Sequence, residues 1–118
     1  MGTTMSQLDR DARNSPLTLS PEEIAGLPWQ PVTRCQGVSE KELYRIDDRV
    51  DALISYQPGA TTPGRPHPAS HHIWVVAGEA IISGQTLTAG SYVYVPKGVT
   101  HPITAGQDGC TLFQVHLP

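Results

Sequence analysis

The sequence predicts an all-β fold, an antiparallel barrel or sandwich that follows a short N-terminal arm and helix. Glycine and proline supply 11 residues each in a chain of 118 and interrupt it at short, even intervals. The runs between these interruptions are too short to hold the helices that connect parallel strands. An apolar content of 38% suits strands whose residues alternate between a core and solvent. At this length the chain is expected to form a single domain with its own core.

The N-terminal part carries the signals of a short helix. Residues 1–19 are polar and have no apolar period, which favours a loose arm. Ser20 is suited to cap a helix, and Pro21 fits its first position. Two glutamates follow, where the positive end of the helix dipole favours acidic side chains. Gly26 and Pro28 are expected to end the helix within about two turns.

The rest of the chain is predicted to consist of short strands. We expect an arm with its helix over residues 1–27 and one β domain over residues 28–118. Gly78 and Gly90 are predicted to form tight turns between strands. The candidate strands are residues 42–46, 50–57, 72–77, 79–83, 91–95 and 111–117.

The charge pattern argues against nucleic acid and membrane partners. The net charge is −3, and the eight basic residues are scattered, whereas binding to a phosphate backbone needs a basic face. The long weakly charged stretch over residues 66–96 is interrupted by polar residues, so it is not expected to span a membrane. Cys35 and Cys110 stand far apart without a CxxC spacing. Reduced thiols in a cytoplasmic protein are the simplest interpretation, although the sequence leaves a disulfide open.

Histidines are concentrated in one part of the sequence. Four of the five lie within a stretch of about 35 residues that is otherwise short of ionisable groups. Neutral imidazoles that converge from neighbouring strands make a good site for Fe(II), Zn, Ni, Cu or Mn. Two of the histidines are adjacent on a predicted strand, so only one of them can face the interior. The five are His67, His71, His72, His101 and His116.

The segment before His101 resembles the second of the two sequence motifs of the cupin superfamily. That motif has Gly, five residues, Pro, one residue, Gly, two residues, His, three residues and Asn. Here Gly90, Pro96 and Gly98 occupy their places at the family's spacing. His101 follows at the histidine position, and Ala105 replaces the asparagine.

An earlier segment resembles the first cupin motif, which has Gly, five residues, His, one residue, His, three or four residues, Glu, six residues and Gly. Gly59, His67 and Gly78 match the two glycines and the second histidine. Arg65 stands in place of the first histidine, and His71 in place of the glutamate. The order of shorter segments is similar to one cupin branch, which includes the cupin domains of ChrR-type anti-sigma factors and the acetylacetone-cleaving dioxygenase.

The resemblance covers roughly residues 28–118 and implies a double-stranded β-helix, the jelly-roll-like barrel of the cupins. It also implies that one divalent transition metal is held by His67, His71 and His101. Fe(II) is the expected metal, and Zn, Ni, Mn and Cu are the alternatives. His72 is the reserve ligand if a one-residue bulge reverses the strand alternation. A neutral three-histidine site leaves the full charge of the metal in place and favours an anionic ligand.

Two further residues are candidates for a catalytic role. Arg65 cannot ligate a metal, but it suits a clamp for a carboxylate or enolate if it faces the site instead of solvent. His116 lies on the last predicted strand, where it could line the pocket or donate a proton. A solvated position near the end of the chain is the alternative for His116.

We therefore expect a metal-dependent, dioxygenase-like enzyme that acts on a small organic acid, diketone or enol. A non-catalytic sensor module that binds a metal or small molecule is the alternative. A metal-free cupin that binds an anion through Arg65 is a third hypothesis. A homodimer is also expected, because such barrels often leave apolar sheet surface to be covered.

Overall fold

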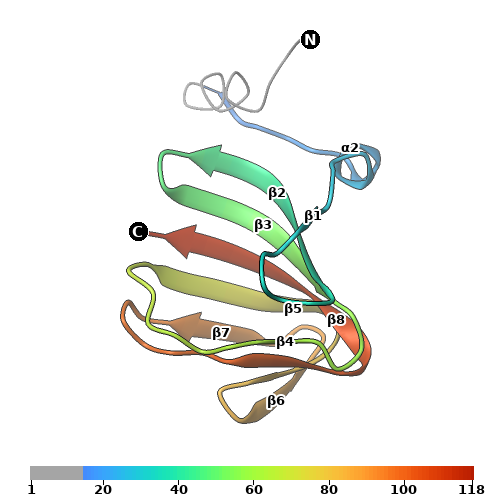
Figure 1. The fold of residues 1–118 in the computed structure, drawn as a ribbon. Helices are drawn as coiled ribbons and strands as arrows, with labels where there is room; N and C mark the ends of the chain where they lie inside the picture. Colours follow the sequence, from blue (N-terminus) through green and yellow to red (C-terminus); the bar gives the residue numbers. More distant parts are fainter. Residues whose placement is uncertain (1–14) are drawn as a thin grey trace.

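The computed structural model describes residues 15–118, and this range forms one short helix and eight strands (Figure 1). Part of the predicted arm, residues 1–14, lies outside the described residues. The elements are α2 (Pro21–Ala25), β1 (Gln30–Pro31), β2 (Val38–Ile46), β3 (Arg49–Tyr56), β4 (Thr61–Thr62), β5 (Ser70–Ile82), β6 (Gln85–Thr88), β7 (Tyr92–Val95) and β8 (Ile103–Leu117).

Helix α2 forms where the sequence predicts it. The Oγ of Ser20 accepts a hydrogen bond from the backbone N–H of Glu23 at 3.1 Å, and the Glu23 carboxylate accepts one from the Ser20 N–H at 2.8 Å. This reciprocal capping satisfies two backbone donors that the first helical turn leaves free. The Nζ of Lys41 in β2 donates to the carbonyl of Ile24 at 2.7 Å and ties the helix to the sheet. A membrane-spanning helix is absent from residues 15–118.

The strands form one curled antiparallel sheet, so the all-β prediction is confirmed. Their order is β1-β2-β3-β8-β5-β6, with β4 added to β8 and β7 added to β5. The two longest strands, β5 and β8, pair from Ser70 opposite Leu117 to Ile82 opposite Ile103. In Figure 1, β8 turns where its colour changes from orange to red. The first part of this strand pairs with β4, and the second part pairs with β3.

Gly78 lies inside β5 and not in a turn, so the prediction that two strands meet there is wrong. Its φ of 77° is in the left-handed region, and the ladder with β8 shifts register on both sides of it. A Cβ atom at this position would stand 2.2 Å from the carbonyl oxygen of Gly109. Glycine is required here because two strands approach closely at a bulge.

Other strand limits also differ from those predicted. Strand β2 begins at Val38 instead of residue 42, and β8 begins at Ile103 instead of residue 111. The turn signals that end in Gly109 mark a second left-handed position within β8, where the strand continues. The short strands β1, β4 and β6 were not predicted, because segments of two to four residues are too short to show an alternation of apolar and polar side chains.

The interior is apolar, and one outer face of the sheet is aromatic. Ile73 and Leu112 are completely buried at the centre of the core. On the outer face, Trp74, Tyr92 and Tyr94 are 40%, 46% and 50% exposed. The thiols of both cysteines are free. The aromatic face is where we expect a second copy to pack, and the homodimer stays a prediction.

Candidate metal centre

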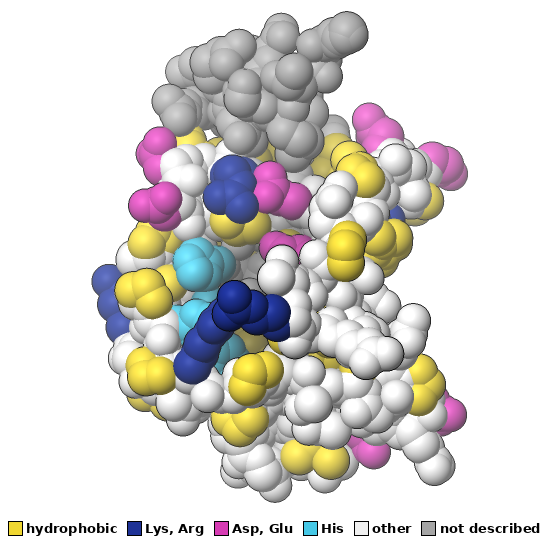
Figure 2. Space-filling view, viewed as in Figure 1, with side chains coloured by type: hydrophobic (Ala, Val, Ile, Leu, Met, Phe, Trp, Pro, Cys, Tyr) yellow, Lys and Arg dark blue, Asp and Glu magenta, His cyan; other side chains and the backbone are white. Residues whose placement is uncertain are grey.

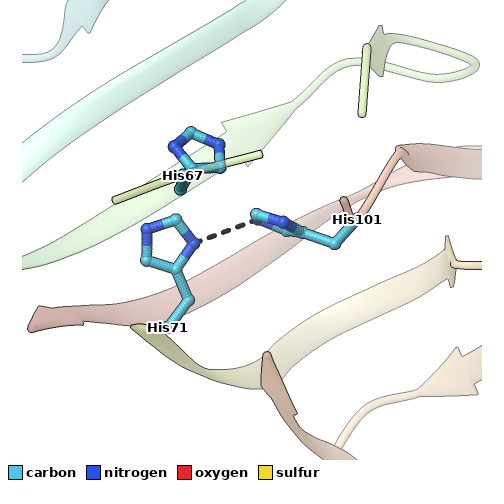
Figure 3. A group of neighbouring side chains, drawn as sticks. All are labelled: His67, His71 and His101. Carbon is cyan, nitrogen blue, oxygen red and sulfur yellow. Dashed lines mark hydrogen bonds between the residues drawn. The ribbon is translucent and has the colours of Figure 1, made fainter. Parts of the chain in front are cut away.

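Three histidines from separate segments converge inside the barrel (Figure 3). His67 lies in the loop between β4 and β5, His71 lies in β5, and His101 lies just before β8. The backbone N–H of Gly98 donates to the carbonyl of His67 at 2.8 Å. The Pro96–Gly98 corner, which ends with a φ of 79° at Gly98, therefore holds the segment of His101 against that of His67.

Strand alternation places His71 inside the barrel and His72 outside it. His71 is only 3% exposed. The Nδ1 of His72 lies 2.6 Å from the hydroxyl of Tyr92 on the outer face. The register shifts of β5 begin only after Val75, so no bulge reverses the alternation at the two histidines. The structure thus brings His71, and not the reserve candidate His72, to the cluster.

The spacing of the imidazole nitrogens fits a bound metal ion. The Nδ1 of His71 lies 3.0 Å from the Nε2 of His101 (Figure 3). One ring nitrogen from each of the three residues lies within 4.8 Å of the others. Two nitrogens about 2.1 Å from one ion stand roughly 3.0–3.4 Å apart at tetrahedral to octahedral angles. The closest pair already has this spacing, and three imidazole donors are a set that first-row transition metals bind, so the residues could hold such an ion.

The cluster is held in its neutral form. Burial, with the neighbouring imidazoles of His101, His116 and His67, lowers the pKa of His71 to about 3. Burial also lowers the pKa values of His67 and His101, and the positive charge of Arg65 adds to the effect at His67. A neutral imidazole keeps a lone pair for a metal, so all three side chains can ligate at neutral pH.

Acidification is expected to destabilise the metal-free protein. The pKa of His71 is about 3 in the folded chain, against 6.5 for an unperturbed histidine. At a pH between these two pKa values, His71 takes up a proton in the unfolded chain and stays neutral in the folded chain. The stability contribution is therefore complete above pH 6.5 and is lost as the pH falls toward 3.

Urea unfolding of metal-free protein at about pH 7 and about pH 5 measures this effect, with a lower midpoint expected at the lower pH. The decrease should be smaller in His71→Gln, which cannot titrate. An equal decrease in the two proteins would show that His71 is not the responsible group.

A fourth histidine lies against the cluster. His116 in β8 is directly opposite His71 in the ladder, and its Nδ1 lies 2.9 Å from the Nε2 of His71. Both ring nitrogens of His71 therefore have imidazole partners, and His116 is placed to fix the orientation of the His71 ring. His116 is half-buried and borders a cavity that His67 and His71 also line, and its catalytic role stays a prediction.

Removing the His116 side chain is expected to weaken metal binding without abolishing it. Loss of a partner that orients a metal ligand typically costs about 10–100-fold in affinity. Competition of His116→Ala with a chromophoric chelator for Zn(II) measures the change, and His72→Ala on the outer face is the matched control. Wild-type affinity in His116→Ala would mean that His71 keeps its orientation without this contact.

The three histidines line a cavity of about 440 Å³. Figure 2 shows histidine side chains (cyan) beside a hollow, with basic side chains (dark blue) next to them. Arg65 is exposed yet borders this cavity, and its charge acts on His67. Apolar side chains such as Ile54 and Ile103 form part of the wall. Arg65 therefore lies at the site while remaining in contact with solvent.

Two charged residues of this cavity, Glu40 and Arg34, were not identified from the sequence. Glu40 is opposite Ile54, a core residue, in the ladder between β2 and β3, and so it faces the interior. The predicted strand began at residue 42, and the inward alternation from Val38 was therefore not followed to Glu40. Arg34 lies in a turn, where spacing gives no signal of which way a side chain points.

Comparisons with known proteins agree with this architecture. The family model of the ChrR cupin-like domain matches residues 22–118. Among solved structures, the polyketide cyclase RemF from Streptomyces resistomycificus is 17% identical, with 85% of this chain and 80% of that chain covered and a TM-score of 0.73. An RmlC-like cupin from Shewanella frigidimarina is 23% identical, with 86% of this chain and 91% of that chain covered and a TM-score of 0.73.

An acetylacetone dioxygenase from Acinetobacter johnsonii is 15% identical, with 88% of this chain and 74% of that chain covered and a TM-score of 0.69. No curated protein matches the chain. At these identities the solved structures establish a shared fold, and the predicted double-stranded β-helix is confirmed.

Proposed function

The chain belongs to the family of ChrR cupin-like domains. We propose that it is a metal-dependent, dioxygenase-like enzyme acting on a small organic acid, diketone or enol. The observation that carries the proposal is the convergence of three neutral imidazoles on an open cavity with a guanidinium beside it. Cupins serve many activities, so the argument rests on these side chains and not on the barrel.

The proposed ligands are His67, His71 and His101, with Fe(II) as the first choice of metal. Bound there, such an ion would supply Lewis acidity and positions for an oxygen-donor substrate and for O₂. Since the ligand set is neutral, the site favours a substrate that brings negative charge.

The remaining residues of the site bind and orient the substrate. Arg65 offers a planar fork of donors that matches a carboxylate or an enolate, and it borders the same cavity as the three proposed ligands. The apolar wall formed by side chains such as Ile54 limits water around the bound anion, which strengthens its attraction to Arg65. His116 positions His71, and we keep it as the candidate proton donor because it borders the adjoining cavity.

Oxygen uptake by Fe(II)-loaded protein tests the proposal. The panel consists of 2,4-pentanedione, 2-oxo acids and carboxylated enols, each with product analysis. Wild type is expected to consume O₂ with at least one of them, and Arg65→Gln to be at least about tenfold slower at unchanged iron content. Fully loaded wild type that consumes neither O₂ nor any substrate would contradict an enzymatic role and favour a non-catalytic binding module.

A further inference from the structure

A second arginine borders the cavity that contains the histidines. Arg34 lies between β1 and β2, and Arg65 lies between β4 and β5, so the two guanidinium groups come from separate segments. Both residues are exposed. Within residues 15–118, neither guanidinium is engaged in a hydrogen bond or ion pair. Both arginines therefore belong to the wall of one cavity and have no competing partner within this range.

The backbone of Arg34 is unusual for a residue with a long side chain. The N–H of Cys35 donates to the carbonyl of Val32 at 3.1 Å and closes a turn with Arg34 at its third position. Arg34 has a φ of 67°, and turns with a left-handed third residue favour Gly or Asn there. Arginine at this position has a conformational cost that the turn itself does not require, which is typical of residues kept for binding.

The charges around the cavity favour a ligand with more than one negative charge. Among the residues of the described part of the chain that line this cavity, Glu40 is the one acidic residue, and there are two arginines. A divalent ion on the histidines would add two further positive charges. With one charge from each arginine, two from the ion and one negative charge from Glu40, the wall carries a net charge of about +3. A monoanion would leave most of this charge uncompensated in a partly apolar cavity, whereas a dianion compensates the larger part of it.

We infer that the substrate of this site is a small dianion, such as a dicarboxylate or a carboxylate-bearing enol, with its second anionic group bound by Arg34. This inference rests on the proposed function, because the first anionic group occupies the metal and Arg65. Arg34 then acts as a specificity determinant: it distinguishes a dianion from the corresponding monoanion. Glu40 acts in the opposite sense and limits the affinity for any anion.

Calorimetric titration of Zn(II)-loaded protein with malonate and with its monomethyl ester tests the inference. The two probes have nearly the same size and differ by one charge. Arg34→Asn removes the guanidinium while keeping a residue that tolerates the left-handed backbone, and Arg34→Lys restores the positive charge. Arg49→Gln is the control. The Nε of Arg49 lies 3.2 Å from a carboxylate oxygen of Asp51, and Arg49 does not line the cavity.

Wild type is expected to bind malonate about tenfold more tightly than the ester. Arg34→Asn should lose about tenfold for malonate and less than about twofold for the ester, with a thermal midpoint no lower than that of wild type. Arg65→Gln should weaken both ligands, Glu40→Gln should tighten both, and Arg34→Lys should recover part of the malonate affinity. Arg49→Gln should bind both as wild type does.

Two results separate this inference from the proposed function. Metal content is measured on the same samples, and protein that holds no Zn(II) would contradict the proposed function whatever the anions do. Metal-loaded protein that binds malonate and the ester equally would contradict the inference alone. The same holds for an Arg34→Asn variant that loses both ligands to the same extent or loses neither.

Discussion

Gly78→Ala is expected to destabilise the fold by about 3 kcal/mol or more, or to prevent folding. The added Cβ would stand 2.2 Å from the carbonyl oxygen of Gly109 and 2.8 Å from the Cα of Cys110, and both are backbone atoms that cannot rotate away. The φ of 77° adds the strain of a left-handed alanine. Urea unfolding followed by circular dichroism measures the loss.

Gly84→Ala is the matched control for this substitution. Its φ of 82° is nearly the same, but no atom lies within 4 Å of the added Cβ. Its cost is therefore only the left-handed backbone, about 1–2 kcal/mol. If the two variants lose the same stability, the close approach of β5 and β8 at Gly78 is not what requires glycine.

His71→Ala is expected to lower metal affinity by more than about 100-fold, beyond the effect of losing an orienting partner. His71 is the central ring of the cluster, with 3.0 Å and 2.9 Å contacts from its two nitrogens to His101 and His116. His72→Ala changes the next residue of the same strand, and its side chain contacts Tyr92 on the outer face, so its affinity should equal that of wild type.

Titration of both variants with Co(II), whose absorption reports coordination geometry, distinguishes the two histidines. Circular dichroism of the metal-free proteins controls for folding. Loss of metal from His72→Ala and not from His71→Ala would reverse the assignment. It would mean that β5 carries the bulge that the reserve hypothesis required.

The histidine cluster was predicted from the resemblance to the cupin motifs, and two local rules support it. Alternation along a strand separates His71 from His72, and the Pro96–Gly98 corner fixes where the segment of His101 begins. The resemblance to the cupin motifs added the expectation that these segments meet. The structure brings the three side chains together, and their role as ligands stays a prediction.

Two kinds of feature could not be predicted. Gly78 gives the same local signal in a turn as in a bulge, because both need a left-handed backbone, and only the partner strand at Gly109 decides between them. Alternation from Val38 would have turned Glu40 inward, but only the curl of the sheet brings that inner face to the cavity, and Arg34 reaches the cavity through the direction of a turn. These are tertiary properties that period and composition do not contain.

The central claim is that this barrel holds one divalent transition metal on His67, His71 and His101. Elemental analysis of protein incubated with Fe(II), Zn(II) or Ni(II) and freed of excess metal tests it most directly, with His101→Ala beside wild type. Close to one ion per chain is expected in wild type, with a near-complete loss in the variant. Wild-type protein that retains none of the three metals would contradict it.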